Sequence, residues 1–212
     1  MSLNKVIDYT ILKKNTDLLQ IREACETAMQ NNYFGFCCFS KFIPEAKKIL
    51  SSSDIKLVTV ISFPEGTNSL NDKIIETQRA IDLGADELDI VMNYSFLKTN
   101  KIQELNREIN TLTELIHKNN LIVKIIIESG ILTYEEIEKT CEICINNHVD
   151  FIKTSTGMVQ PGAEIDKIKF IKKLLPSEIK IKASGGIKTL EQIKTFYEAG
   201  ADRIGTSSKI IF

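Results

Sequence analysis

Eight short β-rich runs alternate with seven amphipathic helical stretches along the whole chain. The expected strands are residues 6–12, 33–39, 56–62, 86–92, 121–127, 149–154, 178–182 and 202–206. The expected helices are residues 16–31, 41–51, 69–83, 100–119, 134–147, 163–174 and 189–199. A repeated strand–helix order is typical of a parallel sheet that is covered by helices. The alternation therefore leaves two folds, a closed (β/α)8 TIM barrel and an open doubly wound sheet.

The number of strands favours the closed barrel. An open sheet that binds a dinucleotide would carry Gly-x-Gly-x-x-Gly after its first strand, and this chain has no such motif. The 212 residues, 43% of them hydrophobic, suit a single domain over residues 1–212. Only residues 207–212 follow the last expected strand, so we expect a truncated final helix. Apolar barrel surface left uncovered there would favour a subunit contact, for example in a homodimer.

Several expected helix ends carry residues that are suited to capping. Short polar side chains precede four helices and serve as candidate N-caps: Thr16, Asn68 or Ser69, Thr133 and Thr189. Gly84 and Gly200 follow two helices, where glycine adopts the left-handed conformation most easily. These signals place helix boundaries close to the limits given above.

Charged and apolar residues alternate along expected strands four to seven. Alternate residues of a strand share one face, and the apolar face must pack against the helices. The charged face therefore points into the barrel, and it carries Glu87, Asp89, Lys124, Lys153, Lys180 and Lys182. A buried charge is costly unless it is paired, so we expect these groups to lie close to one another.

Position along the strand separates two interpretations of these charges. TIM-barrel enzymes carry their active sites at the carboxyl ends of the strands, where Asp89, Lys153 and Lys182 lie. For Glu87, Lys124 and Lys180, which lie earlier, two interpretations stay open: a paired ionic core that fixes strand register, or part of the site. Glu128 follows strand five and is a candidate partner behind the site.

Two neighbouring inward lysines suggest imine chemistry. At a separation of roughly 5 Å and an effective dielectric near ~20, like charges repel by about 3 kcal/mol, which lowers the pKa of one lysine by about two. Burial acts in the same direction. One of the two is then a neutral amine near neutral pH, as a Schiff-base nucleophile must be. The charges alone do not say which lysine that is.

Glycine-rich loops follow expected strands seven and eight. Residues 183–187 read Ala-Ser-Gly-Gly-Ile, and residues 205–208 read Gly-Thr-Ser-Ser. Many TIM barrels hold phosphate in these two loops, where glycine lets backbone amides approach an anion. We therefore expect a phosphate seat that is formed by Gly185, Gly186, Gly205, Ser207 and Ser208.

The motifs together resemble those of the deoxyribose-phosphate aldolases. The segment 151–157 (Phe-Ile-Lys-Thr-Ser-Thr-Gly) resembles that family's Schiff-base lysine motif. The segment 180–187 resembles the one that carries its second active-site lysine, and 84–91 the one that carries its aspartate. Segments 8–10, 60–66 and 205–208 also resemble family segments, so the similarity spans nearly the whole chain.

The resemblance implies reversible cleavage of 2-deoxy-D-ribose 5-phosphate to D-glyceraldehyde 3-phosphate and acetaldehyde. It makes Lys153 the imine-forming nucleophile, Lys182 the charged neighbour that activates it, and Asp89 the group that handles protons. Thr156 and Gly157 join the phosphate seat, and no metal or other cofactor is implied.

The chain departs from the family pattern at a few positions. Tyr9 stands where many members have histidine, Ser40 where many have proline, and Met158 where some carry a basic residue. The short C-terminus lacks the mobile tyrosine tail of some members. These departures concern affinity and rate rather than the type of reaction.

Composition and the remaining motifs argue against other classes of function. The net charge of −1 and the lack of a basic run disfavour a nucleic-acid partner. No apolar stretch approaches the roughly 20 residues of a membrane span, and nothing resembles a signal peptide. The five cysteines suggest a reduced, cytoplasmic protein, with Cys141 and Cys144 in the core. His117 and His148 lie off the strands, so no metal site is expected.

Two rival functions remain after this comparison. A phosphosugar isomerase or epimerase would use the same phosphate seat but would need no imine-forming lysine. A non-catalytic sugar-phosphate-binding protein would gain nothing from two inward lysines beside an aspartate.

Overall fold

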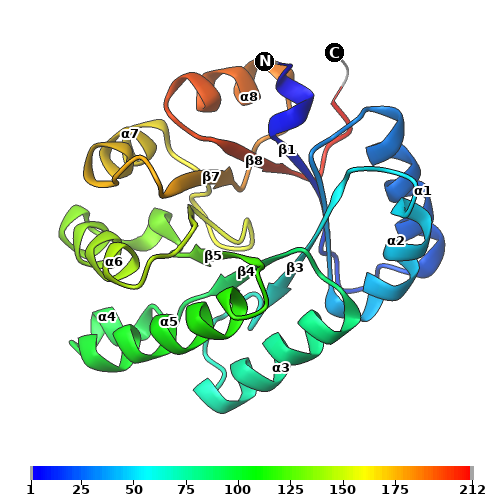
Figure 1. The fold of residues 1–212 in the computed structure, drawn as a ribbon. Coiled ribbons are helices and arrows are strands. Elements are labelled where there is room, and N and C mark those ends of the chain that lie inside the picture. Colours follow the sequence, from blue (N-terminus) through cyan, green and yellow to red (C-terminus); the bar gives the residue numbers. More distant parts are fainter. Residues whose placement is uncertain (1, 211–212) are drawn as a thin grey trace.

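The computed structural model describes residues 2–210 and shows a closed barrel of eight parallel strands (Figure 1). The strands are β1 (Ile7–Ile11), β2 (Gly35–Cys38), β3 (Lys56–Ile61), β4 (Glu87–Val91), β5 (Ile122–Ile126), β6 (Phe151–Lys153), β7 (Lys180–Ser184) and β8 (Arg203–Thr206). Each strand pairs with the next in the chain, and β8 pairs with β1. The closed barrel is therefore confirmed, and the open sheet is excluded.

Helices surround the barrel in Figure 1 and cover the outer face of the strands. They are α1 (Leu18–Gln30), α2 (Ile43–Leu50), α3 (Leu70–Leu83), α4 (Ser95–Lys98), α5 (Ile102–His117), α6 (Tyr134–Asn146), α7 (Ile165–Leu174) and α8 (Leu190–Glu198). Three 3-10 helices are η1 (Leu3–Val6), η2 (Ser40–Phe42) and η3 (Ser129–Ile131). Neither α4 nor the 3-10 helices were expected from the sequence, because they are too short to show an apolar period.

The final helix was expected to be truncated, and residues 207–210 contain no helix after β8. Residues 211–212, to which that expectation extends, lie outside the described part of the chain. None of the helices between residues 2 and 210 combines the length and apolar character that a membrane span requires.

Most of the expected helix caps are present. Ser69, Thr133 and Thr189 each accept a hydrogen bond from the third residue of the helix that follows. Thr16 was the wrong choice for α1, because the helix begins at Leu18, two residues after the expected start at residue 16. Asp17 is the cap: its carboxylate accepts a bond from the Gln20 amide, and the Gln20 side chain accepts one from the Asp17 amide.

The apolar core lies between the strands and the helices. Leu88, Ile90 and Ile125 are buried there, together with Cys141 and Cys144 of α6, and those two cysteines are free thiols as expected. The opposite face of the strands fills the barrel interior, where the register places Asp89 beside Lys124 and Lys153 beside Lys182. The predicted direction of the charged face is therefore confirmed.

Candidate active site

Asp89, on β4, lies at the centre of a buried cluster of lysines. Its Oδ1 accepts a hydrogen bond from Lys124 at 2.8 Å. Its Oδ2 accepts bonds from Lys153 at 2.9 Å and from Lys182 at 2.8 Å. Burial alone would raise the pKa of Asp89, but the three ammonium groups outweigh burial and hold that pKa well below its usual range. Asp89 is therefore a carboxylate that forms ion pairs with lysines from three different strands.

Lys182, on β7, has a second carboxylate within reach. Its Nζ contacts Asp8 Oδ2 on β1 as well as Asp89 Oδ2. Burial would lower the pKa of Lys182, but the carboxylates of Asp8 and Asp89 outweigh burial and raise it above its usual range. The two carboxylates therefore favour the ammonium form of Lys182.

Lys153, on β6, differs from the other two lysines in its exposure. Among the acidic groups of residues 2–210, it contacts only Asp89. A cavity of about 640 Å³ opens at the carboxyl ends of the strands, and its lining includes Lys153 but neither Lys124 nor Lys182. The geometry thus distinguishes the two lysines that the sequence pattern leaves equivalent.

Two further charged groups enter the cluster, and neither was expected from the sequence. Asp8 lies at 2.9 Å from the guanidinium of Arg203, which belongs to β8. Burial alone would raise the pKa of Asp8, but Lys182 and Arg203 lower it to about 2. Each lies two positions before a residue that lines the cavity, Thr10 for Asp8 and Gly205 for Arg203, so both are on the inward face.

The interpretation left open for the earlier strand positions can now be decided for two of them. Lys124 contacts Glu87 at 2.5 Å, and Arg203 contacts the same carboxylate at 3.3 Å. Glu87 and Lys124 thus belong to a paired ionic core. Lys180 does not, because it is exposed at the beginning of β7 and has no acidic partner among residues 2–210.

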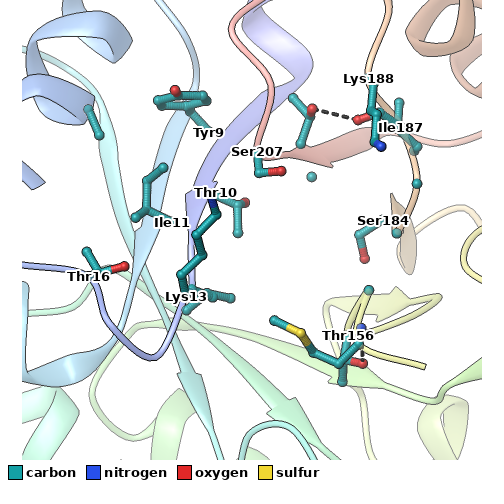
Figure 2. Close-up of a pocket in the computed structure, with 18 of the residues that line it drawn as sticks. Tyr9, Thr10, Ile11, Lys13, Thr16, Thr156, Ser184, Ile187, Lys188 and Ser207 are labelled. Carbon is teal, nitrogen blue, oxygen red and sulfur yellow. Dashed lines mark hydrogen bonds between the residues drawn. The ribbon is translucent and has the colours of Figure 1, made fainter. Parts of the chain in front are cut away.

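The cavity brings together most of the residues expected to bind phosphate. Its lining includes Thr156, Gly157, Gly185, Gly186, Gly205 and Ser207, as well as Lys188 and Lys13. Figure 2 shows Thr156, Ser184 and Lys188 across the cavity from the labelled residues of β1 and its following loop. Gly186 has φ +81°, and no atom lies within 4 Å of the position that a Cβ would occupy. The backbone at Gly186 is therefore accessible to a ligand.

Two of the expected phosphate residues have other roles in the structure. Ser208 does not line the cavity, and its amide donates a hydrogen bond to Thr206 Oγ1 at 3.1 Å. Gly205 lines the cavity and also leaves room for Lys182, since a Cβ at residue 205 would lie 3.4 Å from Lys182 Cε and 3.1 Å from Ser184 Cβ.

Glu128 does not line the cavity but holds a residue that does, Thr156. It follows β5 in a left-handed conformation, with φ +54°, and it is buried. Thr156 donates its hydroxyl to Glu128 at 2.6 Å and its amide at 3.3 Å. Burial raises the pKa of Glu128, and the bonds from Thr156 offset only part of that effect. Glu128 thus fixes the loop that carries Thr156 and Gly157.

Within residues 2–210, no three His, Cys, Asp or Glu side chains gather in a way that could hold a metal ion. His117 pairs with Asp150 at 2.9 Å, away from the cavity. Cys37 lies on the inward face of β2, and burial raises its pKa to about 11, so it remains a thiol.

Comparison with known proteins gives concordant matches over nearly the whole chain. The family model described as DeoC/LacD family aldolase matches residues 3–208. The deoxyribose-phosphate aldolase of Ureaplasma parvum is 42% identical over 207 residues, which cover 98% of this chain and 95% of that protein. The solved structure titled "QR15, an Aldolase" has a TM-score of 0.93 and 36% identity, and the match covers 99% of this chain and 93% of that one. A deoxyribose phosphate aldolase from Aeropyrum pernix, described as tetrameric, has a TM-score of 0.90 and 26% identity, with 98% and 87% coverage.

Proposed function

The chain belongs to the DeoC/LacD family of aldolases, and from that premise we propose that it cleaves 2-deoxy-D-ribose 5-phosphate reversibly to D-glyceraldehyde 3-phosphate and acetaldehyde. Lys153 is the proposed Schiff-base nucleophile. One observation carries this choice: of the three lysines around Asp89, Lys153 is the one that lines the cavity. The name of the Ureaplasma parvum relative supports the choice of sugar.

Imine formation requires the neutral amine of Lys153. The amine attacks C1 of the open-chain sugar, and the carbonyl oxygen leaves as water after it gains two protons. Asp89 Oδ2 lies at hydrogen-bond distance from both Lys153 and Lys182. We propose that Asp89 accepts the proton that Lys153 loses, and that the Lys182 ammonium supplies, through the shared Asp89 carboxylate, a proton for the departing oxygen.

The protonated imine then draws electrons from the bond between C2 and C3. As that bond breaks, the C3 hydroxyl loses its proton and C3 becomes the aldehyde carbon of D-glyceraldehyde 3-phosphate. C2 is left as the terminal carbon of an enamine. A proton added to C2 regenerates an imine, and water releases acetaldehyde and the free Lys153 amine.

The proposed phosphate seat lies in the loops that follow β6, β7 and β8. Backbone amides at Gly185, Gly186 and Ser207 would bind the phosphate, and Lys188 would add a charge. A phosphate held there uses binding energy from a remote group to place C1 against Lys153. Because Met158 adds no charge, we assign a larger share of the binding to backbone amides.

The test is acetaldehyde release from 2-deoxy-D-ribose 5-phosphate, compared between Lys153→Met and Lys180→Met. We expect Lys153→Met to abolish turnover. Lys180→Met is the matched control, because that lysine lies on the neighbouring strand but is exposed outside the cluster, and it should retain turnover. An isomerase or epimerase would convert the sugar without acetaldehyde, and a binding protein would not convert it. Either result, or turnover that survives Lys153→Met, would overturn the proposal.

We also propose that the chain self-associates, as a homodimer or a larger assembly, next to β8. No helix follows β8 in residues 207–210, and the Aeropyrum pernix relative is described as tetrameric. Sedimentation at micromolar concentration tests this proposal, and a single species with the mass of one chain would contradict it.

A further inference from the structure

Six buried side chains form a closed ring of alternating charge inside the barrel. In order around the ring they are Glu87, Lys124, Asp89, Lys182, Asp8 and Arg203, which returns to Glu87. The ion pairs that close the ring measure 2.5, 2.8, 2.8, 2.5, 2.9 and 3.3 Å in that order. Each ring cation contacts two carboxylates, and the ring contains as many cations as anions. The ring is therefore electrically neutral.

Lys153 is a seventh charged side chain of the cluster, and no further carboxylate of the ring balances its charge. Its one carboxylate contact, Asp89 Oδ2, is already shared with Lys182. With Lys153 protonated, the ring and Lys153 together carry one excess positive charge, and with Lys153 neutral they carry none. A low-dielectric interior disfavours an uncompensated charge. Of the four cations in this cluster, Lys153 is therefore the one without a carboxylate contact of its own.

The other inward groups are the same in every variant considered below. On β2 the nearest titratable side chain is Cys37, whose pKa burial raises to about 11. The inward positions of β3 are Val58 and Val60. Glu128, after β5, accepts a hydrogen bond from Thr156 and interacts electrostatically with Lys153, and both interactions are common to every variant considered below.

Arg203 is a fixed element of the ring. A guanidinium stays protonated throughout the working pH range, and this one packs on the Phe34 ring at 3.4 Å from its centroid. Its two ring partners are Asp8 and Glu87. Neither Arg203 nor Glu87 lines the cavity, so neither would touch the substrate.

We propose that Arg203 and Glu87 are positioning residues that set the charge of the ring and thereby the pH at which Lys153 becomes a nucleophile. This inference rests on the proposed role of Lys153. The proposal predicts that Arg203 and Glu87 shift the pH at which Lys153 loses its proton in opposite directions, although the two residues contact each other and are both buried.

The signs follow from the charge count. Arg203→Met leaves the ring with a net charge of about −1, so Lys153 becomes its balancing cation and keeps its proton to higher pH. Glu87→Gln leaves a net charge of about +1, so Lys153 loses its proton at lower pH. A charge acting over roughly 10 Å at an effective dielectric near ~20 predicts a displacement of about one pH unit in each direction. The double variant restores a neutral ring and should return the midpoint to that of the parent.

The experiment measures the rate of reductive ethylation of Lys153 by acetaldehyde and sodium cyanoborohydride, from about pH 6 to about pH 10. Peptide mapping reports modification of Lys153 itself, whether or not the variant turns over sugar. Arg203→Lys keeps the charge and should keep the parental midpoint. Arg79→Met, on the exposed face of α3, is the surface control and should leave the midpoint unchanged.

The outcomes separate this inference from the proposed function. If the parent enzyme forms no adduct on Lys153, the proposed function fails. If the parent is labelled but both single variants share its midpoint, or shift in the same direction, the ring does not act through charge and the inference fails. If a single variant does not fold, the double variant still tests the inference, because a displaced midpoint would contradict it.

Discussion

Replacing Asp89 with asparagine keeps the shape of the side chain but removes the charge that three lysines share. The excess charge of the ring and Lys153 then rises from one positive charge to two, because the ring loses one of its three anions. The folded protein can return to the parental excess by releasing a proton from one lysine. With an ordinary lysine pKa of about 10.4, that release costs about 5 kcal/mol at pH 7 and about 2 kcal/mol at pH 9.

Asp89→Asn should therefore lose about 5 kcal/mol of unfolding free energy at pH 7, relative to the parent enzyme. In a chain of this size, that loss lowers the Tm by about 10–20 °C. The deficit should shrink as the pH rises, because the unfolded variant then binds more protons than the folded one.

Urea unfolding followed by circular dichroism at pH 7 and pH 9 measures both quantities. The matched control is Asp72→Asn, on the exposed first turn of α3, which should change stability by less than about 1 kcal/mol. A loss below about 1 kcal/mol for Asp89→Asn, or a deficit that does not change with pH, would refute this account of the shared charge.

The same geometry makes three further predictions. The pKa of Asp8 in the folded protein is about 2, against an ordinary value of 3.8. Asp8 should therefore contribute about 2 kcal/mol of stability that is present above about pH 4 and is lost as the pH falls towards 2. Urea unfolding between pH 2 and pH 5 should show this loss of stability, and the Asp8→Asn variant should lack this pH dependence. Ser207→Asp should reduce kcat/KM for the phosphorylated sugar by about two orders of magnitude and for 2-deoxyribose far less, because it adds negative charge to the proposed seat; an equal loss for both sugars would place the phosphate elsewhere. Gly35→Ala should destabilise the fold by about 1–3 kcal/mol, because its Cβ would lie too close to Asp8 Oδ1; thermal unfolding measures the change, and an unchanged Tm would show that Asp8 can move aside.

The barrel could be predicted from the sequence because the signals for it are local and repeated. Each strand of a parallel barrel is followed by a helix, so the order of elements carries the topology without long-range information. The inward face of β4 to β7 could be predicted for the same reason, since Glu87 and Asp89, or Lys180 and Lys182, mark a period of two.

The missed parts of the cluster lack that local repetition. Asp8 and Arg203 are single charges on short strands, each followed two positions later by an uncharged residue. Their partners are distant in sequence, with 195 positions between Asp8 and Arg203. The distinction between Lys153 and Lys182 depends on which side chain reaches the cavity, and alternation along a strand does not report this.

Two neighbouring lysines repel each other as an isolated pair, but Lys153 and Lys182 are not isolated. Asp89 Oδ2 lies within hydrogen-bond distance of both, and the sequence pattern did not show that they share this carboxylate oxygen. Whether such a pair activates a nucleophile therefore depends on the charge balance of the whole ring.

The most direct test of the central claim is to trap the imine itself. The enzyme would be incubated with 2-deoxy-D-ribose 5-phosphate, reduced with sodium borohydride, digested and mapped by mass spectrometry. We expect one irreversible adduct, on the peptide that contains Lys153, and a loss of activity in proportion to its yield. No adduct, or an adduct on Lys182 alone, would contradict the assignment of Lys153 as the nucleophile.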